Sequence, residues 1–441
     1  MGVETVVNLL EALRGSQLLS SEQLQDIGHD VVNRWEKPVD LARDLVARGW
    51  LTRFQAQQAM QGRGSELVLG AYRLLERLGE GGMGQVYKAR HRKMNRVVAL
   101  KVIRRDKLGN ADAIRRFFRE VQAAATLDHP NIVVAYDADK VGDTYFFAME
   151  YVDGHDLAKL VKQKGRLKLG KACEYMRQAA LGLQHAHGKG MVHRDIKPSN
   201  IIVRNAGSGS EAAPLVKILD MGLARVSGPL GDDGGTPLTQ VHTILGTPDF
   251  IAPEQARSSH EVDIRSDLYS LGCTFYYILT GQVPFPAQTP MEKLLKHYLE
   301  EPPRVEALRP EVPRGVAALV RKLMAKSPDQ RPQSPAEVVQ VLGTMVGSHV
   351  PPAIPLAMPV GPAAPEKQAD PPAPEDEPAE ETVADVGMEF ATSESIDQVI
   401  RTKPTARRHP ARRQLVTFAV LGAVIGLMLA LLALFVRYAL R

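Results

Sequence analysis

The chain has very little cysteine, its first residues give no reason to expect a secretory signal, and neither sign of charge dominates. Cys173 and Cys273 are the two cysteines among 441 residues. They lie far apart in apolar surroundings, so neither a disulfide framework nor a cysteine-rich metal site is available, and a reducing compartment fits. The first residues carry no basic cluster and no apolar run, so we expect no secretory signal. The formal net charge is only +5, and the composition therefore gives no reason to expect a nucleic acid as a partner.

The apolar content of the chain is that of a globular protein. The first 66 residues predict a helical module. Apolar residues make up 44% of the chain, and leucines recur at helical spacing in residues 1–66. Two short segments, residues 19–23 and 51–55, both read L-[ST]-x-x-Q, in which Ser20 and Thr52 could cap the starts of helices. The module is either a docking or regulatory unit or an extension that packs on the next domain, and the sequence favours neither interpretation.

A glycine-rich segment comes after the predicted module. Gly79, Gly81 and Gly84 form the pattern G-x-G-x-x-G between two stretches that read as strands. Dinucleotide-binding folds use this pattern too, but there the third glycine opens a helix. Here residues 85–89 continue as a strand, which favours a hairpin whose tip lies over ATP phosphates. Glycine suits that place because a side chain would keep the backbone amides away from the phosphate oxygens.

The stretch from His193 to Asn200 has the composition of a phosphoryl-transfer site. It places an acid, Asp195, a base, Lys197, and an amide carbonyl, Asn200, in one short loop between apolar residues. Phosphoryl transfer needs an acid that orients a hydroxyl, a cation that neutralises phosphate charge and a side-chain oxygen that holds a metal. The alternative, a charged surface turn, does not account for this combination.

The motifs resemble those of protein kinases, and they occur in the same order. Residues 193–200 match H-R-D-x-x-x-x-N, the catalytic loop of that family, and residues 97–101 resemble its V-A-I-K strand. Residues 218–222 resemble D-F-G, except that Met221 replaces phenylalanine, and residues 246–254 resemble the anchor G-T-P-x-Y-x-A-P-E. The resemblance covers about residues 72–345 and is closest to the bacterial eukaryotic-like (Hanks-type) serine/threonine protein kinases.

The resemblance implies an α+β fold with two lobes, a small β-rich N-terminal lobe and a larger α-helical C-terminal lobe. It implies ATP and protein substrates, and Mg²⁺ as the cofactor, with Mn²⁺ as an alternative. Asp195 would orient the acceptor hydroxyl, and Lys197 would contact the γ-phosphate. Lys101 would contact the α- and β-phosphates with Glu120 as its ion-pair partner. The metal would be held by Asn200 and Asp220, and the nucleotide would be lined by Gly79, Gly81, Gly84, Val86, Ala99, Lys101, Glu150, Val152 and Asp156.

Further positions take their expected roles from the same resemblance. Glu150 and Val152 would meet the adenine through backbone groups, and Asp156 would approach the ribose, with an ordinary strand-and-turn residue as its alternative. Glu254 would pair with Arg331 inside the helical lobe, and Asp267 would brace the catalytic loop. Arg194 suggests a site that is switched by activation-loop phosphorylation, since a buried guanidinium requires an anion. The candidate phosphorylation sites are Thr236, Thr239 and Thr243, and a dimer would allow trans-autophosphorylation.

The last part of the sequence predicts a linker and a membrane anchor. Residues 346–400 are rich in proline, alanine and acidic residues, which cannot bury enough apolar surface to order themselves. Residues 401–414 are basic, and residues 415–436 carry no charge. A helix of that length spans a bilayer, and the preceding basic cluster places the kinase domain in the cytoplasm. The sequence therefore predicts a single-pass, tail-anchored membrane protein.

Two other classes of function compete with a kinase. A pseudokinase scaffold would keep the fold and recruit partners without catalysis, but Lys101, Asp195, Asn200 and Asp220 are all present. A dinucleotide-binding enzyme is disfavoured by the strand that comes after the glycine-rich loop. The sequence names neither the protein substrates nor the activating signal.

Overall fold

The computed structural model describes residues 3–28, 35–205, 214–221, 248–257 and 262–346. The predicted linker from residue 347 onward, the basic segment 401–414 and the predicted span 415–436 lie outside these residues. So do Thr236, Thr239 and Thr243 of the predicted activation segment. Within the described ranges, no helix is both long and apolar enough to cross a bilayer.

The N-terminal module is helical, and several of its helices begin at side-chain caps. Thr5 accepts a hydrogen bond from the N–H of Asn8 (3.1 Å) at the start of the first helix. Thr52 begins the last one with a capping box, in which it and Gln55 bind each other's backbone N–H groups. The elements before the first long strand are α1 (Val6–Ser16), α2 (Ser21–Gly28), α4 (Pro38–Ala47), α5 (Arg53–Met60) and the 3₁₀ turn η1 (Gly64–Leu67).

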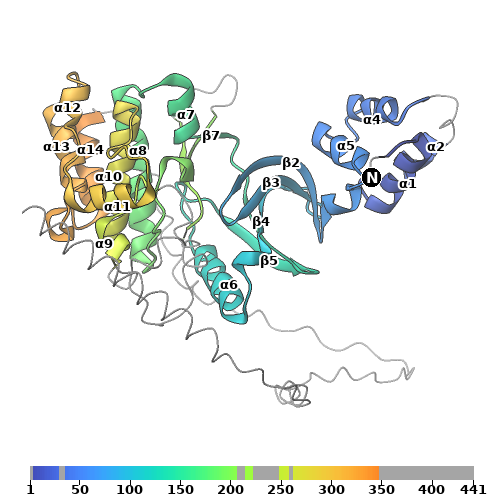
Figure 1. Ribbon diagram of the computed structural model, residues 1–441, viewed down its shortest axis with the longest axis horizontal. Coiled ribbons are helices and arrows are strands. Elements are labelled where there is room, and N and C mark those ends of the chain that lie inside the picture. The colour runs from blue at the N-terminus through green and yellow to red at the C-terminus, as the bar shows by residue number, and fades with distance from the viewer. Residues whose placement is uncertain (1–2, 29–34, 206–213, 222–247, 258–261, 347–441) are drawn as a thin grey trace, which may run out of the picture. The chain divides into compact units, whose positions relative to one another are not determined.

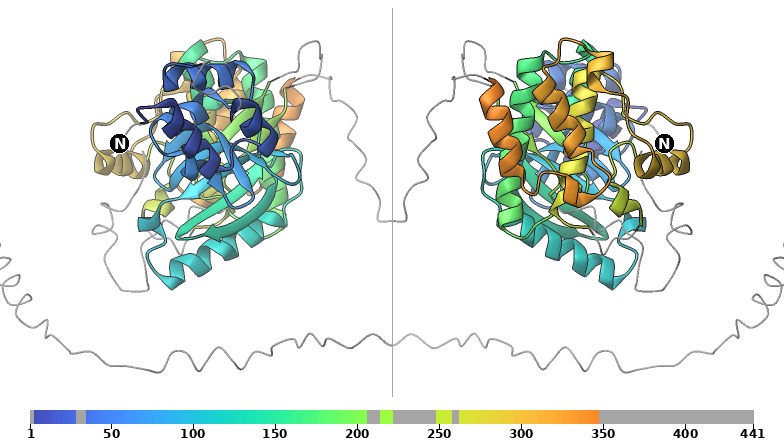
Figure 2. Two further views of the ribbon diagram at one scale, coloured as in Figure 1. Left: turned by 90° about the vertical axis from the view of Figure 1, so that its right-hand side faces the viewer. Right: turned by 90° about the vertical axis from the view of Figure 1, so that its left-hand side faces the viewer.

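The next part of the chain is an antiparallel sheet that forms the N-terminal lobe. Its strands lie in the order β1-β2-β3-β4-β6-β5, and α6 runs alongside β5 (Figures 1 and 2). The elements are β1 (Val68–Leu69), β2 (Tyr72–Gly81), β3 (Gly84–His91), β4 (Val97–Ile103), η2 (Arg105–Lys107), α6 (Ala111–Ala125), β5 (Ala135–Val141) and β6 (Thr144–Glu150).

The two faces of this sheet belong to different apolar clusters. Successive side chains of a strand point to opposite faces, so β4 sends Val98 and Leu100 to one cluster and Ala99 and Ile103 to the other. The first cluster also contains buried side chains of the N-terminal module, such as Leu13. The second contains residues of α6. The N-terminal module therefore shares a hydrophobic core with the kinase-like sheet.

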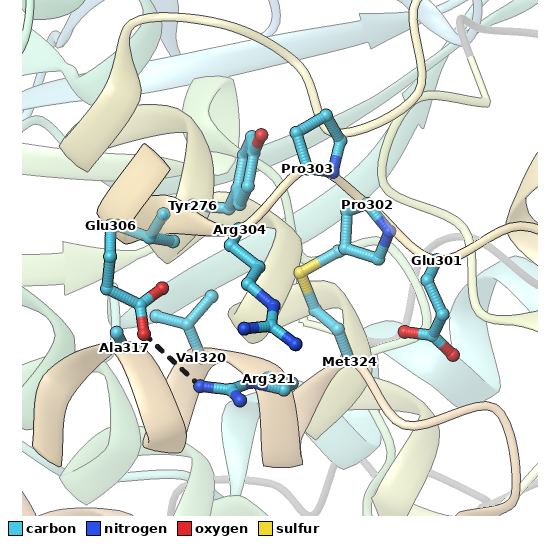
Figure 3. A pocket seen from close by; sticks show the side chains of 11 residues that line it. Tyr276, Glu301, Pro302, Pro303, Arg304, Glu306, Ala317, Val320, Arg321 and Met324 are labelled. Atoms are coloured by element: carbon cyan, nitrogen blue, oxygen red, sulfur yellow. Dashed lines mark hydrogen bonds and ion pairs between the residues drawn. The ribbon is translucent and has the colours of Figure 1, made fainter. Parts of the chain in front are cut away.

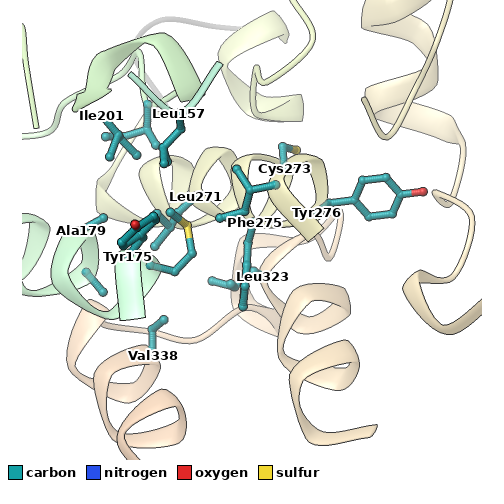
Figure 4. Packing of buried hydrophobic residues seen from close by; sticks show 14 of the residues in the cluster. Leu157, Tyr175, Ala179, Ile201, Leu271, Cys273, Phe275, Tyr276, Leu323 and Val338 are labelled. Carbon is teal, nitrogen blue, oxygen red and sulfur yellow. The ribbon is translucent and has the colours of Figure 1, made fainter. Parts of the chain in front are cut away.

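The C-terminal lobe is mostly helical and contains a small sheet of order β7-β8-β9, which lies beside its helices (Figure 1). Helix α10 (Ile264–Thr280) carries fully buried side chains that include Leu271 and Phe275, which pack with Leu323 (Figure 4). Each such side chain contributes about 1.5–3 kcal/mol on burial. The strands are β7 (Gly154–Asp156), β8 (Ile201–Arg204) and β9 (Val216–Ile218). The helical elements are α7 (Leu157–Lys164), α8 (Leu169–Gly188), η3 (Pro198–Asn200), α9 (Pro253–Arg257), α10 (Ile264–Thr280), α11 (Pro290–Leu299), α12 (Val305–Leu308), α13 (Arg314–Leu323), η6 (Pro328–Gln330) and α14 (Pro335–Val346).

A pocket in the helical lobe lies between α10, α12 and α13. Tyr276 and Met324 contribute to its lining, and an ion pair between Arg321 and Glu306 (3.3 Å) lies beside it (Figure 3). None of the residues that the sequence assigned to the nucleotide or metal lines this pocket.

Candidate active site

The loop between α8 and β8 holds the candidate catalytic acid, and Asp267 of α10 fixes its backbone. The carboxylate of Asp267, which is 1% exposed, accepts hydrogen bonds from the N–H of His193 (2.8 Å) and of Arg194 (2.7 Å). Arg194 has a φ of 68°, in the left-handed region that non-glycine residues rarely adopt. The predicted brace is therefore confirmed, and it acts on the residue directly before Asp195.

Asp195 is joined to two other predicted site residues. The ammonium of Lys197 lies 2.7 and 2.9 Å from the two carboxylate oxygens of Asp195. The side-chain amide of Asn200 donates to the backbone oxygen of Asp195 (2.8 Å) and to its Oδ2 (3.0 Å). The side chain of Asp195 remains 44% exposed. An acid that is oriented on two sides and still reachable from solvent can receive a hydroxyl proton from an incoming substrate.

Lys101 and Asp220 form an ion pair that joins the N-terminal sheet to the segment after β9. Lys101 Nζ, in β4, lies 2.7 Å from Oδ2 of Asp220, which comes shortly after β9. Burial alone would raise the pKa of Asp220, but the neighbouring ammonium of Lys101 outweighs it and holds the pKa below its ordinary value. Asp220 therefore stays ionised, as a metal ligand must be.

The partner of Lys101 differs from the expected one. The resemblance to protein kinases implies Glu120 in that role, and Glu120 is buried on α6, with 7% of its surface exposed. The structure gives the short ion pair of Lys101 to Asp220 instead. A single ammonium can be approached from either side of the cleft, and motif order alone does not decide which carboxylate is nearer.

The glycine-rich segment is the turn of the β2–β3 hairpin, where Gly81 pairs with Gly84. A Cβ on Gly84 would lie 1.9 Å from the carbonyl oxygen of Val102, whereas a Cβ on Gly79 or Gly81 would meet nothing within 4 Å. Gly84 is therefore required for the close approach of β3 to β4. This reason differs from the expected one, which was access of backbone amides to phosphate.

The face of the hairpin that continues toward Lys101 is formed by predicted nucleotide-lining residues. Val86 pairs directly with Lys101 across β3 and β4. Ala99 lies two residues before Lys101 on the same strand and therefore on the same face. Both Val86 and Ala99 belong to the cluster that includes α6. The structure thus brings the glycine turn, Val86, Ala99 and Lys101 to one face of the sheet.

The end of β6 was predicted to contact the adenine through its backbone, but one of the backbone groups there already has a hydrogen-bond partner within the protein. The N–H of Glu150 donates to the carbonyl of Val134 (2.9 Å), so its backbone could offer adenine only the carbonyl. The side chain of Glu150 instead pairs with Lys217 of β9 (2.7 Å). Val152, the other predicted backbone contact, is buried in the cluster of α6.

Lys217 is a residue that the sequence reasoning missed. It lies between two buried apolar residues of β9, is 6% exposed, and also donates to the carbonyl of Ile132 (3.2 Å). A lysine inside an apolar strand needs a partner, because burying an unpaired charge is costly. The position of Lys217 between apolar strand residues was therefore the signal in the sequence that could have indicated a buried ion pair. The pair with Glu150 links the end of β6 to the helical lobe.

Asp156 has a structural role in this conformation. Its carboxylate accepts a hydrogen bond from the N–H of Lys159 (2.8 Å) and so caps the start of α7. The same side chain lies 3.3 Å from the ammonium of Lys159. These contacts are those of an ordinary helix-capping turn residue, and the approach of Asp156 to a ribose stays a prediction.

Two further predictions concern the support of the site. Arg331, which is 1% exposed, donates to both carboxylate oxygens of Glu254 (2.7 and 2.9 Å), which confirms the predicted pair. Burial would raise the pKa of Glu254, but the hydrogen bonds from Arg331 and Ser266 hold it below its ordinary value. Met221 is buried in the cluster of the helical lobe, as expected for an apolar substitute for phenylalanine.

Comparison with known proteins agrees with this arrangement. The "Protein kinase domain" family matches residues 72–342, which is more than half of the chain. The chain belongs to the protein kinase domain family. Among curated relatives of this kinase domain, it is 38% identical over 266 residues to serine/threonine-protein kinase pkn3 of Myxococcus xanthus. It is 38% identical over 271 residues to serine/threonine-protein kinase PknB of Mycobacterium tuberculosis, and 36% identical over 264 residues to serine/threonine-protein kinase PrkC of Bacillus subtilis.

The match is confined to part of each protein. It covers 60% of this kinase's chain and 48%, 41% and 39% of these three relatives, so the chain spans less than half of the length of each. Among solved structures, a double mutant of the PknI kinase domain of Mycobacterium tuberculosis aligns with a TM-score of 0.50 and 24% identity, over 64% of this chain and 97% of that chain. That likeness shows the fold, a β-sheet N-terminal lobe and a helical C-terminal lobe.

Proposed function

We propose that this kinase domain is an active serine/threonine protein kinase that transfers the γ-phosphoryl group of ATP to protein hydroxyls. The observation that supports this most is the convergence of Asp195, Lys197 and Asn200 through hydrogen bonds of 2.7–3.0 Å. Lys101 of β4 and Asp220, which comes after β9, lie 2.7 Å apart. The named relatives are all described as serine/threonine-protein kinases.

The residues of the catalytic loop have separable tasks in such a reaction. Asp195 orients the acceptor hydroxyl and accepts its proton as the bond to phosphorus forms. Lys197, held on Asp195, can reach a phosphoryl oxygen and offset its growing charge. Asp267 keeps the backbone directly before Asp195 in place through His193 and Arg194. Positioning and electrostatic stabilisation together provide most of the catalysis in phosphoryl transfer.

The chemistry of the donor set fits a magnesium ion held by Asn200 and Asp220. The side-chain amide of Asn200 makes two hydrogen bonds to Asp195 through its nitrogen, which leaves its oxygen to face a cation. Asp220 is kept ionised by Lys101. Hard oxygen ligands of this kind suit Mg²⁺, and Mn²⁺ is the natural substitute. When bound, the ion supplies charge neutralisation between the β- and γ-phosphates.

The regulation and the location of the kinase belong to the same proposal. Arg194, directly before Asp195, supports a switch in which phosphate on Thr239 or Thr243 pairs with a guanidinium. Such autophosphorylation would occur between two copies of the chain. The uncharged segment 415–436 behind a basic cluster supports anchoring in a membrane with the kinase domain on the cytoplasmic side.

The proposal is tested by phosphoryl transfer from radiolabelled ATP to an added serine/threonine peptide library, with the full-length chain and magnesium. Asp195→Asn should abolish labelling. Asp143→Asn is the matched control, because it removes the same charge at an exposed turn where Asp143 contacts only Arg105 and Lys140 among the described residues. Equal labelling by the parent and by Asp195→Asn would refute the assignment. No labelling by the parent, together with retained ATP binding, would favour a pseudokinase scaffold.

A further inference from the structure

The two L-[ST]-x-x-Q segments of the N-terminal module form the same local structure. In the first, the N–H of Ser20 donates to Oε1 of Gln23 (2.9 Å), and the N–H of Gln23 donates to the Ser20 hydroxyl (3.2 Å). In the second, Thr52 and Gln55 exchange the equivalent bonds at 2.9 and 3.1 Å. Both segments are therefore capping boxes. Each has two side-chain donors left over, one hydroxyl and one amide.

The two boxes differ in what these remaining donors do. The first box is exposed. In the second, the Thr52 hydroxyl donates to the carbonyl of Leu75 (2.6 Å), and Nε2 of Gln55 donates to the carbonyl of Leu74 (2.7 Å). Gln55 is 2% exposed. The start of α5 is thus bound to two consecutive carbonyls of β2.

These carbonyls lie at an irregularity in the strand that leads to the glycine-rich turn. Leu74 pairs with Ala89 and Glu76 pairs with Lys88, so Leu75 is an extra residue without an opposite partner on β3. A bulge of this kind bends its strand and changes the direction of the residues after it. Here the start of α5 satisfies the carbonyl of Leu75 and that of Leu74 before it, and so binds the bulge directly.

The same helix also contacts the second strand of the hairpin. The ring centroids of Phe54 and of Tyr87 in β3 lie 6.0 Å apart. Tyr87 comes directly after Val86, which pairs with Lys101. Gly79 lies four residues after Leu75, or about 13 Å along an extended strand, and a second register shift lies between Arg77 and Gly79. One short helix therefore contacts both arms of the hairpin a few residues from its glycine turn.

We propose that α5 is a positioning element of the ATP site, and that Thr52 and Gln55 set the direction of the glycine-rich hairpin by holding the bulge of β2. The inference rests on the proposed kinase function for its purpose, but its effect is on nucleotide affinity. When the hydrogen bonds from Thr52 and Gln55 to β2 are lost, the hairpin also adopts other orientations relative to the ATP site. Apparent affinity then falls in proportion to the fraction of molecules whose hairpin is correctly placed.

The chemistry of the second box makes a specific test available. A glutamate at position 55 would still accept from the N–H of Thr52 and complete a capping box, but it has no donor for Leu74. Gln55→Met removes the donor without burying a charge. Gln23→Glu and Gln23→Met make the same changes in the exposed box, so they report the cost of altered capping alone. Thr52→Ser keeps the hydroxyl and should behave as the parent.

The experiment measures the affinity of the full-length chain for the non-hydrolysable analogue AMP-PNP with magnesium by calorimetry, beside thermal unfolding. Gln55→Glu and Gln55→Met should each bind AMP-PNP about tenfold more weakly, which corresponds to a hairpin that is correctly placed in about a tenth of the molecules. Both Gln23 variants and Thr52→Ser should bind as the parent does. If Gln55→Glu does not fold, Gln55→Met decides the question.

Steady-state kinetics separate positioning from general damage. The KM for ATP should rise in the Gln55 variants, while kcat at saturating ATP and the KM for the peptide stay unchanged. Unchanged AMP-PNP affinity in a folded Gln55→Met chain would overturn the inference, as would an equal loss in Gln23→Met. A parent chain that binds AMP-PNP but transfers no phosphate would refute the proposed function and leave this comparison decisive for the hairpin.

Discussion

Replacing Asp267 by asparagine should slow phosphoryl transfer by about tenfold to a hundredfold while ATP affinity stays the same. In the parent, the two carboxylate oxygens of Asp267 accept from two consecutive backbone groups, the N–H of His193 and that of Arg194. In asparagine, one oxygen becomes an NH₂ group. Whichever way the amide is turned, one of these N–H groups then faces a donor.

The magnitude comes from the contacts that are lost. A left-handed conformation costs a non-glycine residue such as Arg194 about 1–2 kcal/mol, and Asp267 offsets that cost. A hydrogen bond to a charged group is worth about 1.5–3 kcal/mol. The loop can relax and recover part of the sum. A remaining cost of ~1.4–2.8 kcal/mol would leave the active arrangement in about a tenth to a hundredth of the molecules.

The assay is steady-state kinetics at saturating ATP, beside calorimetric binding of AMP-PNP and denaturant unfolding of the full-length chain. Asp263→Asn is the control, since Asp263 caps the start of the same helix by accepting from the N–H of Arg265 (2.8 Å). Asparagine caps a helix as well as aspartate does, so kcat should not change. A folded Asp267→Asn chain with parental kcat would refute the reasoning. So would a parallel loss of nucleotide affinity, which would indicate damage to both lobes.

Three further predictions concern stability. Glu254→Gln should lower the free energy of unfolding by about 3–5 kcal/mol, because it leaves a buried guanidinium uncompensated; a loss under about 1 kcal/mol in a denaturant titration would match an exposed pair instead. Burial lowers the pKa of His297 to about 3 from its ordinary 6.5, so below pH 6.5 the unfolded chain binds a proton that the folded chain does not. The free energy of unfolding should therefore fall by about 1.4 kcal/mol per pH unit as the pH drops below that value, and His297→Gln should lose this dependence. Gly84→Ala should lower Tm because its Cβ would meet the carbonyl of Val102, whereas Gly81→Ala should leave Tm unchanged; equal effects of the two would contradict the packing argument.

The chain's motifs predicted the supports of the site well because those supports are specific to residue type. The pair of Glu254 and Arg331 requires a carboxylate and a bidentate guanidinium, and the motifs predict both positions. The brace by Asp267 has the same character, since only a carboxylate accepts from two backbone N–H groups and His187 at once. The α+β, two-lobed fold was predictable from the resemblance of the motifs, in their order, to those of protein kinases.

Contacts that depend on geometry rather than on residue type could not be predicted in this way. Whether Lys101 meets Asp220 or Glu120 depends on where two strands and one helix come together, and the helical cap made by Asp156 depends on where α7 begins. Ser20 and Thr52 carry the same capping signal. The second box, at Thr52, contacts the sheet because the bulge at Leu75 lies beside it. The position of that bulge is set by the register of β2 against β3.

The measurement that tests the account most directly is mass-spectrometric mapping of phosphate on the full-length chain after incubation with ATP and magnesium. The parent and Asp143→Asn should acquire phosphate on serine or threonine, with Thr239 or Thr243 among the modified residues. Asp195→Asn should acquire none. Phosphate on Asp195→Asn at the parental level, or its absence from the parent at every protein concentration, would contradict the assignment of a serine/threonine kinase.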